Sequence, residues 1–249
     1  IEFVPSAGMQ FVTNIPWIET YGINYYIGLD GFSLTILMMI AILIPTAYLL
    51  LWEGKTKGYW INMLLVQSGV TGTLFSLDIV LFYFFWEVML LPVFLMIGSY
   101  GFGDKVFTTI KVTVYTMAGS LLMFAAILYL GVAHFNQFGE WSFAYDSLMQ
   151  ISTIPYDTKV WLFLAFLAAF AIKIPIFPLH TWIMETYKNA PTGAVFLLSS
   201  IMAKLGVYAI VRFMIPIFPD IYVEFSTWFV AIGLFGLIYF GIAALMQND

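Results

Sequence analysis

Residues 160–191 read VWLFLAFLAAFAIKIPIFPLHTWIMETYKNAP, and this stretch decides the fold. Its first half is an apolar helix of membrane-spanning character, but Lys173 lies within it and Pro175 and Pro178 follow at once. A lysine at bilayer depth is costly unless it meets a partner, water or a freed carbonyl. Proline removes a helical hydrogen bond, and lipid tolerates such a break only where the backbone is buried in protein or lines a wet cavity. A charge beside a double proline break therefore predicts an ion path.

The composition requires a membrane as the solvent. Of the 249 residues, 62% are hydrophobic and 9% are charged, whereas soluble domains carry about 25% charged residues. The net charge of −5 offers no basic surface for nucleic acid. Cysteine is absent, which excludes thiolate metal sites and cysteine catalysis, and His134 and His180 are too far apart in sequence for a familiar zinc or haem pair. Because the sequence has no initiator Met, we expect it to be a piece of a longer chain.

Seven stretches are long and apolar enough for a helix that crosses a bilayer, which takes about 20 residues. They are residues 29–52, 59–77, 79–98, 107–132, 159–184, 192–214 and 226–246. A turn at 76–78 predicts that the second and third helices form an antiparallel hairpin, and 133–158 is the one long connection. Residues 1–28, which are rich in Trp and Tyr, are expected to form an external or interfacial segment. The predicted class is an all-α, multi-pass integral membrane protein.

Charged residues sort to two sides if the seven spans alternate in direction. One side holds Lys55, Lys57, Lys105, Lys111 and Lys188. The other side holds Glu2, Glu19, Asp78, Glu140, Asp146, Asp157, Asp220 and Glu224, with the basic residues Lys159 and Arg212 at its margin. Because cytoplasmic loops carry an excess of lysine and arginine, we expect the lysine-rich side to be cytoplasmic. Asp30 and Asp78 are expected to cap helix N-termini.

Glu87, Lys173 and Lys204 are the ionisable residues that lie deep in the predicted spans. At 1.5 Å per residue, Glu87 lies about 12 Å and Lys204 about 18 Å into its helix. Ionisable groups inside a membrane are functional by default, which favours charge or proton movement. The alternative is a structural ion pair between Glu87 and one lysine. Buried ion pairs, however, often add no net stability, and the second lysine would lack a carboxylate.

Smaller groups near these charges have two interpretations each. His180 either relays protons, since histidine titrates near neutral pH, or bonds a carbonyl at the interface. Ser199 and Ser200 either hydrogen-bond Lys204 or serve helix packing as small residues. His134 borders a loop and is interpreted as structural, and the aromatic run before Glu87 as packing.

Two long motifs carry a family resemblance. Residues 82–101 read FYFFWEVMLLPVFLMIGSYG, and residues 170–213 read FAIKIPIFPLHTWIMETYKNAPTGAVFLLSSIMAKLGVYAIVRF. Together they resemble the NuoM-type antiporter-like membrane subunits of respiratory complex I (NADH:quinone oxidoreductase), including the mitochondrial chain-four equivalent. Weaker support comes from GLDGFSL at 28–34 and HFNQFGEWSFAYDSL at 134–148.

The resemblance implies a fourteen-helix fold with two inverted five-helix repeats, each with a discontinuous helix. The first repeat would cover about 59–214, and the second would begin at about 226–249, within a transmembrane domain 29–249. Glu87, Lys173 and Lys204 match the family's proton-translocating residues, with His180 as a further candidate. One departure is PLHTWIMETY at 178–187, where Met184 and Tyr187 replace a proline and a histidine that are usual in the family.

The resemblance also implies the biological setting. NADH, FMN, Fe–S clusters and quinone would belong to partner subunits, and this chain would hold no cofactor or metal. Its partners would be other membrane subunits of complex I, including flanking antiporter-like subunits, in a bacterial inner membrane. The leading hypothesis is proton translocation coupled to electron transfer elsewhere in the complex. The alternatives are an Mrp-type cation/proton antiporter or membrane-hydrogenase subunit, and a scaffold that transports nothing.

Overall fold

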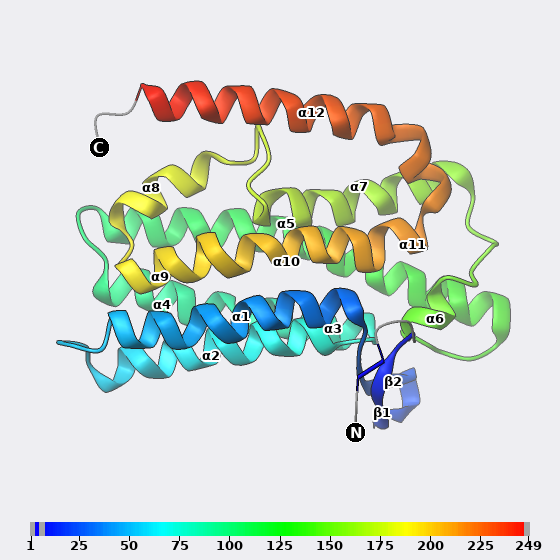
Figure 1. The fold of residues 1–249 in the computed structure, drawn as a ribbon. Coiled ribbons are helices and arrows are strands. Elements are labelled where there is room, and N and C mark those ends of the chain that lie inside the picture. Colours follow the sequence, from blue (N-terminus) through cyan, green and yellow to red (C-terminus); the bar gives the residue numbers. More distant parts are fainter. Residues whose placement is uncertain (1–2, 5–7, 247–249) are drawn as a thin grey trace.

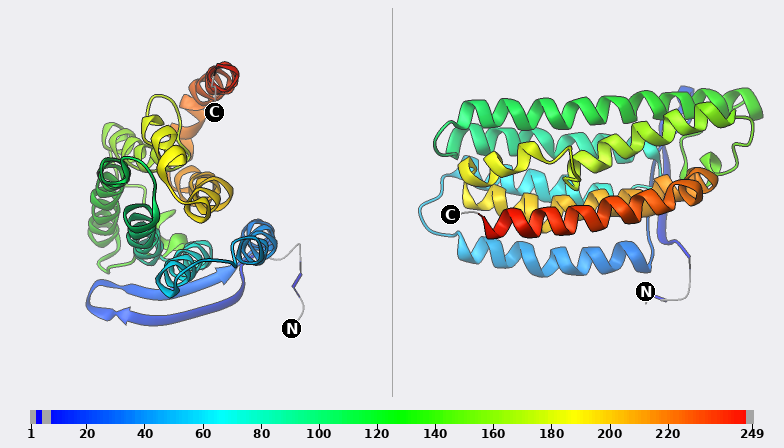
Figure 2. Two further views of the ribbon diagram at one scale, coloured as in Figure 1. Left: turned by 90° about the vertical axis from the view of Figure 1, so that its left-hand side faces the viewer. Right: turned by 90° about the horizontal axis from the view of Figure 1, so that it is seen from above.

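The computed structural model describes residues 3–4 and 8–246, and the predicted outer-side residue Glu2 lies outside them. Long helices run side by side, and a two-stranded sheet lies at one end of them (Figure 1). Seen along the helices, α12 stands at the periphery of the bundle (Figure 2). The helical class is therefore confirmed for most of the chain.

The helices differ from the predicted spans mainly at their ends and at two interruptions. In chain order they are α1 (Gly31–Leu50), α2 (Lys57–Phe75), α3 (Ile79–Val88), α4 (Leu90–Tyr100), α5 (Lys105–Phe138), α6 (Tyr145–Leu148), α7 (Tyr156–Lys173), α8 (Thr181–Asn189), α9 (Thr192–Leu197), α10 (Ala203–Ala209), α11 (Ile215–Ile217) and α12 (Pro219–Leu245). Two π-helical segments, η2 (Leu198–Met202) and η3 (Ile210–Met214), join α9, α10 and α11 into one continuous rod. The predicted long connection is shorter than expected because α5 continues to Phe138.

The N-terminal segment forms an antiparallel hairpin rather than helix or irregular chain. Its strands are β1 (Gln10–Ile18) and β2 (Ile23–Leu29), and they pair directly with each other. Gly22 makes the turn with φ of 60°, and a Cβ there would lie 2.0 Å from the carbonyl oxygen of Trp141, so only glycine fits. An isolated hairpin is marginal in water, and this one docks on the α2–α3 turn, where Leu77 N–H donates to the carbonyl of Tyr26 at 2.8 Å.

By length and apolar composition, five segments in the described part of the chain can cross a membrane. They are Gly31–Leu50, Ile79–Tyr100, Lys105–Phe138, Thr192–Ile217 and Pro219–Leu245. The predicted spans at α2 and α7 fall outside this set. Polar residues lower the apolar character of α2, and α7 carries three charged residues, Asp157, Lys159 and Lys173. Both helices nevertheless lie alongside the five candidates (Figure 1).

Small residues let the helices approach closely. A Cβ on Gly72 of α2 would lie 2.3 Å from the ring of Phe85 on α3, and a Cβ on Gly119 of α5 would lie 2.7 Å from the side chain of Ile172 on α7. Glycine at such crossings replaces side-chain bulk with close backbone packing, which is a common device between membrane helices. The α2–α3 hairpin that the turn at Ser76–Asp78 predicted is confirmed by this contact.

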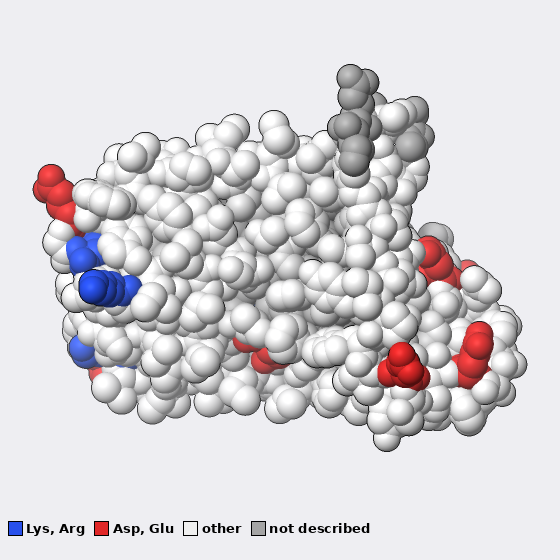
Figure 3. All heavy atoms as spheres, turned by 90° about the horizontal axis from the view of Figure 1, so that it is seen from below, with Lys and Arg blue, Asp and Glu red and all other residues white. Residues whose placement is uncertain are grey.

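Charge is separated along the length of the bundle. The turns that hold Lys55, Lys105 and Lys188 all lie at the end away from the β-hairpin (Figure 1). Basic side chains gather at this end in Figure 3, and acidic side chains lie mainly toward the other end. The predicted sorting of lysines and carboxylates to opposite sides is therefore seen in the fold.

An ion pair between a buried arginine and a half-buried aspartate ties the start of α1 to the rod that contains α10. Asp30 caps α1 as predicted, because its carboxylate accepts from Ser33 N–H at 2.9 Å. The same carboxylate accepts from the Arg212 guanidinium at 2.6 Å, and Arg212 is 7% exposed. Tyr208 accepts a second hydrogen bond from Arg212 at 3.2 Å and donates to the carbonyl of Leu74 at 2.9 Å. One cluster therefore holds α1, α2 and η3 together.

We expect Asp30→Ala to lower the free energy of unfolding by about 3 kcal/mol, because it leaves a buried guanidinium without its counter-charge. Asp30→Asn should cost less, since asparagine keeps the helix cap. The measurement is denaturant unfolding in detergent micelles. Asp104→Asn is the matched control, because Asp104 caps α5 through Phe107 N–H and has no arginine partner among the described residues.

The same pair predicts an acid dependence. Burial raises the pKa of Asp30, but the hydrogen bonds from Arg212 and Ser33 outweigh it and hold this pKa below the usual aspartate value. A lowered pKa gives stability that is present above the unfolded pKa and lost as pH falls through the folded one. The difference in stability between the wild type and Asp30→Asn should therefore close in acid, below about pH 4. An unchanged difference there would contradict this assignment.

Candidate functional site

The helix that decides the fold breaks at the predicted place. The last residue of α7 is Lys173, and α8 begins at Thr181. The break frees backbone carbonyls, and neighbouring groups satisfy them. Ile176 N–H donates to the carbonyl of Ala171 at 2.8 Å, and the indole N–H of Trp182 donates to the carbonyl of Ile172 at 3.1 Å. The prediction of a discontinuous helix is confirmed.

Glu87 and Lys173 face the same small cavity. Glu87 is the second-last residue of α3, and Lys173 is the last residue of α7. The cavity has a volume of about 10 Å³, near the minimum that one water molecule needs. Its walls come from Trp86, Glu87, Leu90, Thr116, Ala169, Ile172 and Lys173. Among the described residues, Glu87 and Lys173 form no ion pair within 4.0 Å, so they share the cavity without closing on each other.

A second cavity is also lined by Lys173. It also has a volume of about 10 Å³. Lys173, Thr116 and Leu90 line both cavities, and the second one extends to Leu198 and Met202 of η2. Lys173 therefore lines both the cavity that Glu87 lines and the cavity that reaches the π-helical segment just before Lys204.

The Lys173 ammonium is held by an aromatic face. Its Nζ lies 4.9 Å from the centroid of the Trp86 ring, and both side chains are buried, at 6% and 3% exposure. A cation over an indole in a dry setting gains about 2 kcal/mol. The interpretation of the aromatic run as packing alone is therefore incomplete, because its last ring contacts the buried lysine.

Lys204 is not brought to Glu87 and Lys173. Its side chain is exposed on the surface of the described chain, and its Nζ donates to the carbonyl of Ser199 at 2.6 Å. Of the two interpretations of these serines, hydrogen bonding of their hydroxyls to Lys204 is not seen. Ser199 Oγ donates to the carbonyl of Val195 at 2.8 Å, and Ser200 Oγ donates to that of Phe196. It is the backbone of the π-helical segment that binds the lysine.

His180 is buried but lies away from both cavities. It is 2% exposed, and its Nδ1 has no hydrogen-bond partner among the described residues. The centroid of its ring lies 5.5 Å from the ring centroid of Phe177 and 5.0 Å from that of Phe240 in α12. The interpretation in which His180 bonds a backbone carbonyl is therefore not supported at its Nδ1 atom. His134 is structural as predicted, because its Nδ1 lies 2.8 Å from the carbonyl oxygen of Glu140.

Two polar groups at the rim form a pair that the sequence did not indicate. Lys111 Nζ lies 3.1 Å from Glu185 Oε1, which joins α5 to α8. Thr116 was also missed, and its hydroxyl donates to the carbonyl of Val112 at 2.8 Å. The only available signal for Trp86 was its position directly before Glu87, and no spacing in the sequence distinguishes Thr116 from the other threonines of α5.

Comparisons with known proteins agree with this arrangement. The family model described as "NADH:quinone oxidoreductase/Mrp antiporter, TM" matches residues 76–249. NADH-quinone oxidoreductase subunit M of Escherichia coli is 33% identical over 255 residues, which cover 98% of this chain and 50% of that protein. NADH-ubiquinone oxidoreductase chain 4 of Arabidopsis thaliana is 33% identical over 250 residues, which cover 98% and 49%. The chain thus spans about half the length of these relatives.

Solved structures show the same fold. A chain of respiratory complex I from Thermus thermophilus superposes with a TM-score of 0.80 at 29% identity, over 90% of this chain and 46% of that one. A chain of the Mrp complex from Dietzia matches in fold alone, with a TM-score of 0.67 at 21% identity, over 83% of this chain and 23% of that one. The family match covers more than half of the sequence, and the chain belongs to the transmembrane family of NADH:quinone oxidoreductase subunits and Mrp antiporters.

Proposed function

We propose that this chain is part of a proton-translocating membrane subunit of NADH:quinone oxidoreductase, and that it moves protons through Glu87 and Lys173. The observation that carries the proposal is the shared cavity, which separates a half-buried glutamate from a buried lysine without a direct ion pair between described residues. The names of the subunit M and chain 4 relatives support the same activity. Electron transfer takes place in partner subunits, and this chain holds no redox centre.

The proposed path follows the two cavities. A proton moves from the Glu87 carboxyl through one water molecule to the neutral Lys173 amine, which becomes an ammonium over the Trp86 ring. Water in the second cavity then accepts a proton from Lys173 and passes it toward η2 and Lys204. The second transfer returns Lys173 to its neutral form, and Glu87, left as a carboxylate, takes up another proton from water before the next transfer. His180 is a weaker candidate, because it lines neither cavity.

The wider architecture is part of the proposal. We infer seven spans, with α2 and α7 added to the five candidate helices because both lie alongside them (Figure 2). The first repeat covers about 59–214, and α12 begins the second repeat within 226–249. Residues 1–28 form an external segment, and the lysine-rich end is cytoplasmic in an inner-membrane orientation. The partners are other membrane subunits of the complex, including flanking antiporter-like subunits.

Two other functions make different predictions. An Mrp-type antiporter would move sodium, and the family model covers both kinds of protein. Transport that requires sodium, rather than a proton gradient alone, would favour that function. A scaffold that transports nothing would keep Glu87 and Lys173 in a closed ion pair, and the open arrangement around the cavity argues against it.

We expect Glu87→Gln to reduce NADH-driven proton pumping by about 100-fold, the lower end of what a positioned proton-transfer group contributes. The assembled complex should still carry its redox centres. The measurement is proton uptake by membrane vesicles, with NADH oxidation followed in the same sample. Glu185→Gln is the matched control, since this carboxylate pairs with Lys111 at the rim and should pump normally. Undiminished pumping by the Glu87 variant would defeat the proposal.

We expect Trp86→Leu to slow pumping by about 30-fold, because loss of the π face removes about 2 kcal/mol from the lysine ammonium. Trp86→Phe should restore most of the rate, since phenylalanine keeps an aromatic face. The readout is again vesicle proton uptake. Trp161→Leu is the control for the same change in volume, because Trp161 is 73% exposed on α7. If the phenylalanine and leucine variants pump equally slowly, Trp86 acts through packing and not through its ring electrons.

A further inference from the structure

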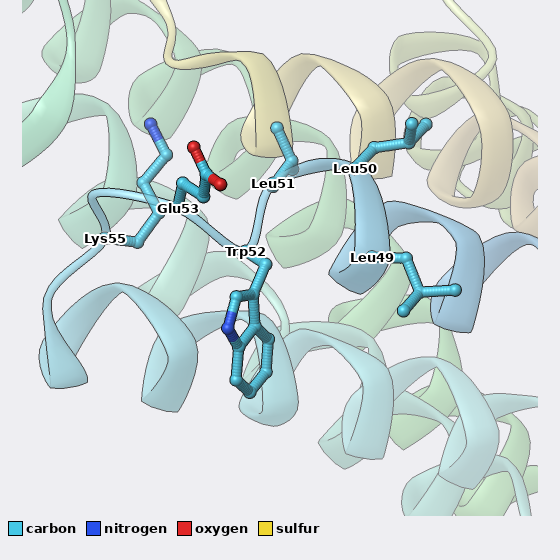
Figure 4. Close-up of a pocket in the computed structure, with 6 residues that line it drawn as sticks. All are labelled: Leu49, Leu50, Leu51, Trp52, Glu53 and Lys55. Atoms are coloured by element: carbon cyan, nitrogen blue, oxygen red, sulfur yellow. The ribbon is translucent and has the colours of Figure 1, made fainter.

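A groove lies where α1 leaves the bundle and turns toward α2. Leu49, Leu50, Leu51, Trp52, Glu53 and Lys55 line it (Figure 4), and its volume is about 730 Å³. None of these six residues lines the two cavities beside Lys173. The groove is therefore separate from the proposed proton path.

The groove lies at the depth where a bilayer changes from hydrocarbon to headgroups. The candidate span of α1 ends at Leu50, and the chain re-enters helix at Lys57. Three of its apolar residues are largely exposed, namely Leu49 (79%), Leu50 (76%) and Trp52 (72%). Tryptophan is enriched at this interfacial level because its ring has an apolar body and one polar N–H. Acyl chains can thus cover the leucines while headgroups meet the polar end.

Two opposite charges line the groove at its polar end. The Lys55 amine and the Glu53 carboxylate point to the same side as Leu50 and Leu51 (Figure 4). Neither forms a hydrogen bond or an ion pair with any other residue that the structure describes. Lys55 Nζ lies 5.3 Å from the centroid of the Tyr59 ring, a contact that leaves its N–H donors available. The groove offers one donor cation and one acceptor anion to a ligand.

We propose that this groove binds a phospholipid whose headgroup carries a protonated primary amine, as phosphatidylethanolamine does. The lipid phosphate meets Lys55, and the lipid ammonium donates to Glu53, so both charges find complements at once. An anionic glycerol headgroup would satisfy Lys55 but would bring its negative charge toward Glu53. A choline headgroup has no N–H to donate to the carboxylate. One acyl chain runs along Leu50 on the side of the two charges, and the other runs along Leu49 and the Trp52 ring, which point to the opposite side (Figure 4).

The test is quenching of Trp52 fluorescence by lipids with brominated acyl chains. The full-length protein is reconstituted in phosphatidylcholine vesicles, and brominated phosphatidylethanolamine, phosphatidylglycerol or phosphatidylcholine is added in turn. The chain has eight tryptophans, so the same titration of Trp52→Phe gives the background to subtract. We expect Trp52 to select phosphatidylethanolamine over both other lipids by about fivefold, in keeping with the modest strength of partly exposed ion pairs.

Charge variants separate headgroup recognition from general lipid contact. Glu53→Gln should abolish the preference for phosphatidylethanolamine over phosphatidylglycerol, because the repulsion of the anionic lipid disappears. Lys55→Gln should weaken both lipids, whereas Lys57→Gln, a neighbouring lysine outside the groove, should change neither. Equal quenching by all three lipids in the wild type would overturn the proposal. Absence of quenching by any of them would also overturn it, since it would mean that another protein segment covers the groove.

Discussion

A lysine in the apolar interior of a membrane protein needs compensation from its surroundings, and the structure around Lys173 provides it in several ways. The helix that carries the lysine stops at that residue, and Trp182 and Ile176 satisfy the carbonyls that the break exposes. The Trp86 ring faces the ammonium, and Glu87 faces the same cavity. Burial of a charge is tolerable only with such partners. The helix break, the aromatic contact and the two cavities therefore all help to accommodate the buried charge of Lys173.

The features that the sequence predicted well are those that a few adjacent residues determine. Pro175 and Pro178 lie within five residues of Lys173, and the α7–α8 break followed from them. The turn at Ser76–Asp78 and the cap at Asp30 are equally local. The hairpin at the N-terminus was missed because its Trp and Tyr residues also fit a membrane interface, while its stability comes from docking on a turn about 50 residues later. The pairing of Arg212 with Asp30 joins residues 182 positions apart, and no pattern within either segment indicates it.

For the candidate site, too, the sequence predicted the features that a few adjacent residues determine and missed those that depend on packing. The burial of Lys173 followed from its place in an apolar run, and the fold brings it to one cavity with Glu87, which is half-buried. Their separation depends on how α3, α5 and α7 pack, which the sequence alone does not give. Lys204 shows the limit of counting residues along a helix. It lies as deep along its rod as expected, yet its side chain is exposed on the described surface and bound to a backbone carbonyl.

The π-helical segments explain why counting fails there. Each residue of an α-helix turns the chain by about 100°, and a π turn accommodates one extra residue in the same rod. The segment Leu198–Met202 therefore rotates everything beyond it relative to α9, and Ile210–Met214 rotates the chain again. A stripe of apolar residues that begins on one side of this rod does not continue on that side past either segment. The direction in which the Lys204 side chain points from the helix is therefore set by the backbone geometry of these segments. The same holds for Arg212 farther along. A periodic pattern of side chains in the sequence does not reveal this geometry.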